Sequence, residues 1–307
     1  MTNGELAFLA LAEELNFTRA AERIYMSQQG LSDHIRRLEQ EYETTLVTRR
    51  PRVELTASGS ALYRMLTEKN AMEKDLQRMI RDIDHGDVGT VSVGISTSRV
   101  RVFASDILQR FHESHPRVRV NIVSELTVTL LQMLRQGELD LVVGVEPEPD
   151  EEFRIEPIFE DPVYFAVPDR LAAERTGSET RVDIRKYADL PFIRDLQDST
   201  TCSMIDRFLA QQNIFLNNLI TVSDYNVQAA LCNRLNAAMF CSHSFAFFSE
   251  GEVVRKGLRV LGIKGLHQSV SICMITSANR TYPRCVTEFE AVVRDSLHRF
   301  SERNLHE

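Results

Sequence analysis

Residues 1–42 carry three short apolar patterns, and this region constrains the fold more than any other part of the chain. In the last pattern, Leu31, Ile35 and Leu38 recur at i, i+4 and i+7, the spacing of one stripe on an α-helix. Ser27 precedes the stripe, where its hydroxyl can accept a hydrogen bond from a free N–H group of the first turn. The pattern therefore predicts a helix that begins after Ser27 and ends near Tyr42.

Two shorter helices are predicted before this one. Leu6, Leu9 and Ala10 share one face of the first helix. We expect the second helix to have Thr18 as its N-cap. It turns three apolar residues inward: Ala20, Ala21 and Ile24. Because alanine is small, this helix can approach its neighbours closely, and the three helices are expected to share one core.

The polar face of the third helix has chemistry that suits DNA. It carries Gln28, Gln29, Ser32, Asp33, Arg36 and Arg37. In a major groove, Gln can pair with adenine, Arg with guanine, and Ser with a base edge or a phosphate. The N-terminal end of such a helix is the end that enters the groove. The alternative is an ordinary amphipathic helix with a solvated polar face.

Charge does not decide between these interpretations. The net charge is −8, whereas nucleic-acid-binding proteins usually show a basic footprint. Residues 27–56 contain five arginines and five acidic residues, so this segment is neutral. The prediction of DNA binding therefore depends on the pattern of residues and not on bulk charge.

Short motifs over residues 17–59 closely resemble those of the LysR-type transcriptional regulators in order and spacing. The matching segments are Phe17-Thr18-Arg19-Ala20-Ala21, Ser27-Gln28, Ser32–Glu39, Leu46-Val47-Thr48-Arg49 and Leu55-Thr56-Ala57-Ser58-Gly59. The resemblance implies a winged helix-turn-helix domain over about residues 1–59, with the helix-turn-helix at about 18–38. It further implies DNA contacts from Thr18, Gln28, Gln29, Ser32 and Arg36, and wing contacts from Arg49, Arg50 and Arg52.

The sequence departs from the family pattern in the region of the wing. Glu43 stands where the family usually has Gly, and Val47 replaces a common Phe. The predicted wing, Arg50–Glu54, is about one residue short. These departures bear on the wing contacts and not on the fold.

A long helix is predicted over residues 57–86. An alternating three- and four-residue spacing joins Leu62, Met65, Lys69, Met72, Leu76, Met79 and Ile83. Such a seam favours pairing with a second helix, and the polar Lys69 can fix its register. The alternative is a helix packed on its own domain. The resemblance implies antiparallel pairing between two subunits, with residues 85–89 as a hinge.

The remaining chain, residues 90–307, alternates strand and helix patterns. Strands are predicted at 91–95, 118–123, 140–145, 162–167, 191–194, 219–223, 237–241 and 269–275, and helices at 100–112, 127–136, 204–211, 227–234 and 285–300. This order implies parallel α/β sheets with helices on both faces. It resembles the two-lobed, periplasmic-binding-protein-like effector domain of LysR regulators. Lobe I would comprise about 90–161 and 268–307, and lobe II about 162–267.

Two α/β lobes of this kind bind small molecules in the crevice between them. The candidate effector contacts are Ser96, Thr97, Ser98, Thr127, Thr200, Thr201 and Cys202. Hydroxyls and free N–H groups at a helix start could hold a carboxylate, which makes a carboxylate one suitable effector. The alternative for each cluster is simple helix capping. Arg99 and Arg101 either help to attract an anion or lie on the surface in contact with solvent.

The sequence lacks the patterns of several other classes of protein. No apolar run has the length of a membrane span, and residues 1–15 lack the basic start of a signal peptide, so a cytoplasmic location is expected. We expect no enzyme, cofactor or metal site, because no catalytic motif or CxxC pair occurs. The five cysteines are expected to be reduced and mostly buried, although Cys202 at a helix start admits a redox-active thiol.

The expected protein is therefore a homo-oligomeric regulator whose partners are double-stranded operator DNA and a small-molecule effector. It would dimerise through the linker helix, associate further into a tetramer, and contact RNA polymerase if it is an activator. One alternative is a constitutive repressor with a vestigial effector domain. Another is a solute-binding protein or enzyme with an added helical arm.

Overall fold

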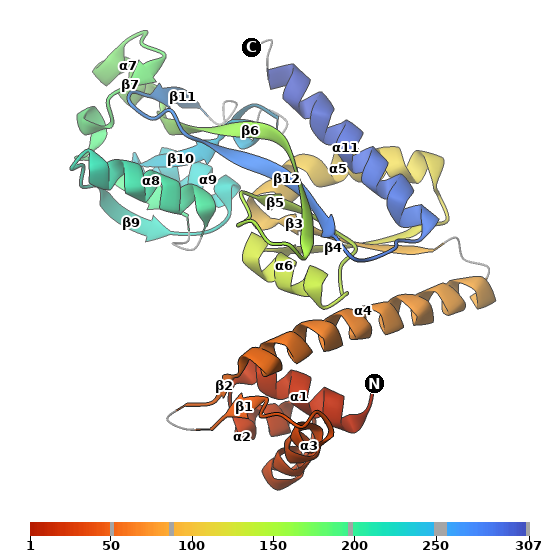
Figure 1. Ribbon diagram of the computed structural model, residues 1–307. Coiled ribbons are helices and arrows are strands. Elements are labelled where there is room, and N and C mark those ends of the chain that lie inside the picture. The colour runs from red at the N-terminus through yellow and green to blue at the C-terminus, as the bar shows by residue number, and fades with distance from the viewer. Residues whose placement is uncertain (50–51, 86–88, 196–198, 249–256, 305–307) are drawn as a thin grey trace. The chain divides into compact units, whose positions relative to one another are not determined.

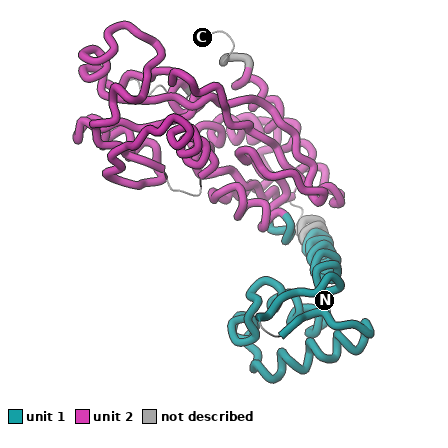
Figure 2. Tube along the Cα trace, turned by 60° about the vertical axis from the view of Figure 1, so that its left-hand side comes forward, with its two compact units in different colours: residues 1–85, 135–138 teal, residues 86–134, 139–307 magenta. Residues whose placement is uncertain are grey.

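The computed structural model describes residues 1–49, 52–85, 89–195, 199–248 and 257–304. Two compact units can be distinguished in it (Figure 2). The first comprises Met1–His85 with Arg135–Glu138, and the second comprises Gly86–Leu134 with Leu139–Glu307.

The first unit contains the three predicted helices, a two-stranded wing and one long helix (Figure 1). Its elements are α1 (Asn3–Glu14), α2 (Phe17–Arg23), α3 (Gln28–Glu41), β1 (Val47–Thr48), β2 (Glu54–Leu55) and α4 (Ala57–His85). Phe8 and Leu11 of α1 are fully buried against Leu31 and Ile35 of α3. The predicted stripe on the third helix is thus confirmed.

The helix starts confirm one predicted cap and correct another. Ser27 caps α3, since its Oγ accepts a hydrogen bond from Gly30 N at 3.1 Å. The predicted Thr18 cap is wrong. Asn16 caps α2 instead, with its Oδ1 accepting from Thr18 N at 2.9 Å and Arg19 N at 3.2 Å. Phe17 is already helical, so Thr18 lies inside the first turn.

The wing joins α3 to α4 through a few specific contacts. Glu39 Oε1 of α3 accepts hydrogen bonds from Leu46 N at 2.9 Å and Val47 N at 3.2 Å. Thr56 Oγ1 accepts from Gly59 N at 3.0 Å. A Cβ atom at Gly59 would lie 2.1 Å from the Leu46 carbonyl oxygen, closer than atoms can approach. The motifs Leu38-Glu39 and Leu55–Gly59 therefore have structural roles at this junction.

Helix α4 is 29 residues long and displays apolar side chains to solvent. Met65, Met72, Leu76 and Ile80 are 63%, 54%, 56% and 51% exposed. Leu62, the first residue of the predicted seam, packs instead against the core of its own unit. Met79 and Ile83 are in the helix, but their side chains lie outside what the structure describes.

The second unit contains one extended sheet flanked by helices. The elements of its first part are β3 (Thr90–Ser96), α5 (Thr97–Ser114), β4 (Arg119–Glu125), α6 (Thr127–Arg135), β5 (Leu141–Val145) and β6 (Phe153–Pro168). They are followed by α7 (Asp169–Thr176), β7 (Arg181–Val182), η1 (Ile184–Tyr187), β8 (Pro191–Arg194), α8 (Thr200–Gln211), β9 (Asn217–Thr221), α9 (Tyr225–Leu235), β10 (Ala238–Ser242) and η2 (Ser244–Phe248). The last elements are β11 (Leu258–Ile263), β12 (Ser269–Ser277) and α11 (Arg284–Asn304).

The sheet runs in the order β4-β3-β5-β12-β6-β10-β8-β9. Strand β6 links its two halves, because residues 153–162 pair with β12 whereas residues 163–166 pair with β10. We call the half around β3 lobe I and the half around β8 lobe II. The pairs β3–β4, β3–β5, β8–β9 and β8–β10 are parallel as predicted, but β6 and β12 pair antiparallel with their neighbours.

Helices α5 and α11 pack on lobe I and place aromatic side chains in its core (Figure 1). The Phe111 and Phe289 rings meet edge to face with centroids 4.8 Å apart, and Phe103 meets Phe300 at 5.0 Å. This packing fixes the start of α5 at the carboxyl end of β3. Among the described helices, none combines the length and apolar character needed to cross a membrane.

Candidate DNA-contacting surface and ligand cleft

The predicted DNA-reading side chains lie on the free face of α3. Gln28, Gln29 and Arg36 are exposed, and Ser32 is half-buried. Arg36 is held by its neighbour Asp33 one turn earlier, with Nη1 3.3 Å from Oδ1. Thr18 is exposed at the start of α2. The helix-turn-helix thus brings these polar groups together on one unit, and nothing in the described residues covers them.

The predicted wing contacts are only partly described. Arg49 is exposed. Its Cζ lies 5.4 Å from the centre of the Phe17 ring, and its Nη2 lies 4.0 Å from Glu39 Oε2. Arg52 is exposed, whereas Arg50 lies outside the described residues. Glu43, at the position where a Gly was expected from the family pattern, has a left-handed φ of 50°. This conformation explains why Gly suits the position.

A cleft of about 940 Å³ opens between the lobes of the second unit. Its lobe I side is formed by the carboxyl ends of β3, β4 and β5 and the starts of α5 and α6. Its lobe II side is formed by the start of α8, and His267, Gln268 and Ser269 line it before and within β12. A volume of this order suits a small molecule.

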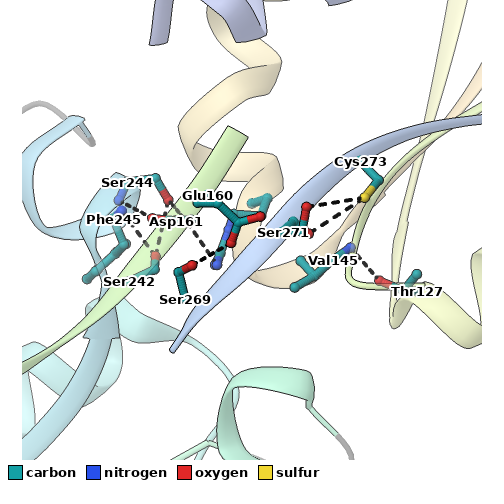
Figure 3. A network of polar contacts seen from close by, with 11 residues as sticks. Thr127, Val145, Glu160, Asp161, Ser242, Ser244, Phe245, Ser269, Ser271 and Cys273 are labelled. Atoms are coloured by element: carbon teal, nitrogen blue, oxygen red, sulfur yellow. Dashed lines mark hydrogen bonds and ion pairs between the residues drawn. The ribbon is translucent and has the colours of Figure 1, made fainter. Parts of the chain in front are cut away.

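Six of the seven predicted effector residues line this cleft: Ser96, Thr97, Ser98, Thr127, Thr200 and Thr201. Ser199 Oγ caps α8 by accepting from Cys202 N at 3.1 Å. Thr127 Oγ1 accepts from Val145 N at 3.0 Å and ties α6 to β5 (Figure 3). Ser96 is 4% exposed, and its Oγ has no hydrogen-bond partner among the described residues. Simple capping therefore does not account for Ser96.

Cys202, the seventh residue, does not line the large cleft. Its side chain is buried beside Arg194, whose Nη2 donates to the sulfur at 3.2 Å. Burial raises the pKa of the Cys202 thiol, and the nearby Arg194 guanidinium opposes this effect only in part. Burial thus works against the redox-active thiol that the helix start admits at Cys202. All five cysteines are free and buried.

Of the two roles considered for Arg99, the solvated surface role is wrong. Its side chain is fully buried and its Nη2 lies 2.9 Å from Asp161 Oδ2. Asp161 also accepts hydrogen bonds from Ser244 N at 2.9 Å and Ser244 Oγ at 2.6 Å (Figure 3). Arg101 is exposed, and its Nη2 lies 2.7 Å from Oδ2 of Asp224 in lobe II. The two arginines thus contact groups of the protein on or near the lobe junction.

Sequence reasoning missed the charged residues of the cleft. Glu125, Glu146, Glu148 and Asp195 line it, together with Arg207. The signal was present, since Glu125 ends β4 and Glu146 directly follows β5. Carboxyl ends of neighbouring parallel strands meet at one edge of a sheet, where ligands bind.

A winged helix-turn-helix unit and a two-lobed α/β unit with a cleft are together typical of a transcriptional regulator with an effector domain. Residues 6–60 match the family model for the bacterial regulatory helix-turn-helix protein, lysR family, and residues 84–298 match the LysR substrate binding domain. The chain belongs to the LysR family of DNA-binding transcriptional regulators, which carry a substrate-binding effector domain.

Curated relatives agree with this assignment, and solved structures share the fold. The chain is 30% identical to the HTH-type transcriptional regulator YcgK of Bacillus subtilis (strain 168) over 60% of this chain and 61% of that protein. It is 23% identical to CysL of the same organism over 88% of this chain and 85% of CysL. The structure of full-length CbnR complexed with its target DNA has the same fold. The match has 20% sequence identity and a TM-score of 0.56, and it covers 96% of this chain and 100% of the CbnR chain.

Proposed function

We propose that the exposed face of α3 reads the operator and that the wing contacts the DNA backbone or the minor groove. The polar side chains Gln28, Gln29, Ser32 and Arg36 lie on the face of α3 that its core contacts leave free. Thr18, Arg49, Arg50 and Arg52 would add contacts that are independent of base sequence. A DNA-binding domain over residues 1–59 accounts for all of these positions.

We further infer that the linker helix, residues 57–86, pairs two copies of the chain. Met65, Met72, Leu76 and Ile80 expose apolar surface along one helix, and such a stripe is costly unless a partner covers it. Pairing would place two recognition helices in successive major grooves, about one turn of DNA apart. Two such dimers would then associate into a tetramer.

The cleft within residues 90–307 is the proposed effector site, and it is the observation that carries the regulatory part of the proposal. It holds hydroxyl groups from both lobes, and β6 gives the lobes a single shared strand. An effector that binds the closed arrangement better than the open one would shift the population of assemblies on DNA. The protein would act in the cytoplasm, contact RNA polymerase if it is an activator, and have no catalytic role.

DNase footprinting of the full chain tests this proposal. The duplex is one that the protein itself selects from a random pool, and the footprint is recorded with and without a small-molecule extract of the source cells. We expect the extract to change the length or position of the footprint. An extract that stabilises the protein but leaves the footprint unchanged would contradict the mechanism. If the protein binds the duplex but no compound in the extract, a constitutive repressor with a vestigial effector domain would be favoured.

A further inference from the structure

The lobe I wall of the cleft is acidic because of where three strands end. In the order β4-β3-β5, the outer strands present Glu125 and Glu146 at their carboxyl ends, and Ser96 ends the strand between them. Ser96 and Glu125 are direct partners in the β3–β4 register. Glu148 lies two residues beyond Glu146 and also lines the cleft. Ser96 therefore ends the middle strand, and an acidic residue stands at or just beyond the end of the strand on either side.

The charges of the cleft do not balance within the protein. The described lining residues include four carboxylates, those of Glu125, Glu146, Glu148 and Asp195, but one arginine, Arg207. None of the three glutamates forms an ion pair with another described residue. Like charges on the walls of one concave surface add their fields and attract cations into it.

Ser96 supplies an independent sign of a ligand in the same place. Its side chain is 4% exposed and its Oγ lacks a hydrogen-bond partner among the described residues. A buried hydroxyl without a partner is costly. Ser96 lines the cleft, so a turn of its side chain would bring this hydroxyl to an ammonium group held by the glutamates, and a hydroxyl accepts as well as donates.

The starts of α5 and α6 also open into the cleft, and their helix dipoles favour negative charge. Each dipole is equivalent to about half an elementary charge, whereas lobe I contributes three carboxylates. The carboxylates therefore dominate on this wall. On the lobe II wall, Arg207 offsets the one carboxylate, Asp195, and the Ser199-capped start of α8 adds a preference for an anion.

We propose that the effector of this regulator carries a protonated amine, bound at the lobe I wall by Glu125, Glu146, Glu148 and the Ser96 hydroxyl. An acid group on the same molecule, where present, faces Arg207 and the start of α8. This inference rests on the proposed effector function of the cleft. It revises the sequence-based expectation of a carboxylate at Ser96–Ser98.

Thermal unfolding of the full chain in fractionated cell extract tests the inference without knowledge of the effector. The small-molecule extract is acidified and split on a cation-exchange resin into an amine-bearing fraction and an amine-free flow-through. A ligand that binds the native state raises the Tm by mass action. We expect the stabilising activity in the amine-bearing fraction. Activity in the flow-through alone would overturn the amine proposal but leave an effector function intact, and activity in neither would overturn both.

Charge-neutralising variants then locate the amine. The triple variant Glu125→Gln, Glu146→Gln, Glu148→Gln should weaken binding of the active compound about tenfold, since each partly exposed ion pair contributes modestly. The matched control is Glu113→Gln, Glu151→Gln, Glu174→Gln, which removes the same charge from exposed positions outside the cleft. Equal affinities for the two triple variants would contradict the assigned wall. Comparing the affinity for diamines with that for amino acids of matched length then shows whether the site prefers a cation or a zwitterion.

Discussion

Arg99 Nη2 lies 2.9 Å from Asp161 Oδ2, and both side chains are completely buried. Arg99 belongs to α5 of lobe I, and Asp161 lies in β6 next to the point where that strand changes partner from β12 to β10. Asp161 also binds Ser244 at the start of η2. The ion pair therefore holds a lobe I helix to the strand shared by the lobes.

Removing one partner of this pair should strongly destabilise the second unit. Asp161→Asn leaves the Arg99 guanidinium buried without its counter-charge, and breaking a buried pair in this way costs about 3–5 kcal/mol. The free energy of unfolding, measured in urea, is expected to fall by this amount. Arg101→Met removes an ion pair at an exposed arginine and should cost less than about 1 kcal/mol. Similar losses for both variants would contradict the role of the buried pair.

Gly59→Ala should loosen the junction between the wing and α4. The added Cβ would lie 2.1 Å from the Leu46 carbonyl oxygen, so backbone must move. We expect a loss of about 1–3 kcal/mol, typical of forced overpacking, measured by urea unfolding. Gly4→Ala is the matched control, because the nearest atom to its Cβ would be 3.8 Å away. A Gly59 variant as stable as the Gly4 variant would argue against the close approach.

The Lys69–Glu5 ion pair should make the stability of the first unit depend on pH. The Lys69 ammonium lies 2.8 Å from Glu5 Oε1, and its hydrogen bond is the main cause that holds the Glu5 pKa below its usual value. A lowered carboxyl pKa stabilises the fold above the unfolded-state pKa, and this contribution is lost as pH falls through the folded-state pKa.

The stability difference between wild type and Lys69→Met should therefore be largest near neutral pH and vanish in acid. Urea unfolding between neutral pH and about pH 3, which spans the carboxyl range, measures it. Arg64→Met, which removes an exposed cation from the same helix, is the control and should show no such trend. A constant difference for Lys69→Met across the range would exclude the Glu5 pair as its cause.

Charges placed on the exposed stripe of α4 should dissociate the oligomer. Met72→Glu with Leu76→Glu puts two carboxylates on the surface proposed to meet a second copy, and burying charge without a partner opposes association. Sedimentation analysis should show a smaller species than wild type. Gln77→Glu adds charge on another face of the same helix turn and should leave the assembly intact. An unchanged mass for the double variant would place the interface elsewhere.

Sequence patterns predicted the local structure well where one helix or strand buries one face. The stripe of α3, the Ser27 cap and the βαβ order of lobe I are all confirmed. Strand β6 was predicted over 162–167 but spans 153–168. It contains prolines at 157, 162 and 168, and the residues with which it pairs in β10 and β12 lie more than seventy positions later in the chain. No local pattern reveals such pairing.

The hydroxyls that line the cleft were predictable from the sequence, but the charge of the cleft was not. Hydroxyls at the starts of α5 and α8 line the cleft as expected. Arg99 could not be placed, because its burial depends on Asp161, which lies 62 positions later in the chain. The acidic wall emerges only when the sheet order brings Glu125 and Glu146 to either side of Ser96.

Reading of the operator by α3 is most directly tested by comparing specific and random DNA. Binding of the full chain to a duplex selected by the wild type, and to a shuffled duplex, is measured over a range of salt concentrations. Gln29→Ala and Arg36→Ala should lose about 1–3 kcal/mol on the selected duplex alone, whereas Arg50→Ala and Arg52→Ala should weaken both and flatten the salt dependence. Equal losses on both duplexes for all four variants would contradict the assignment of α3 as the reading helix.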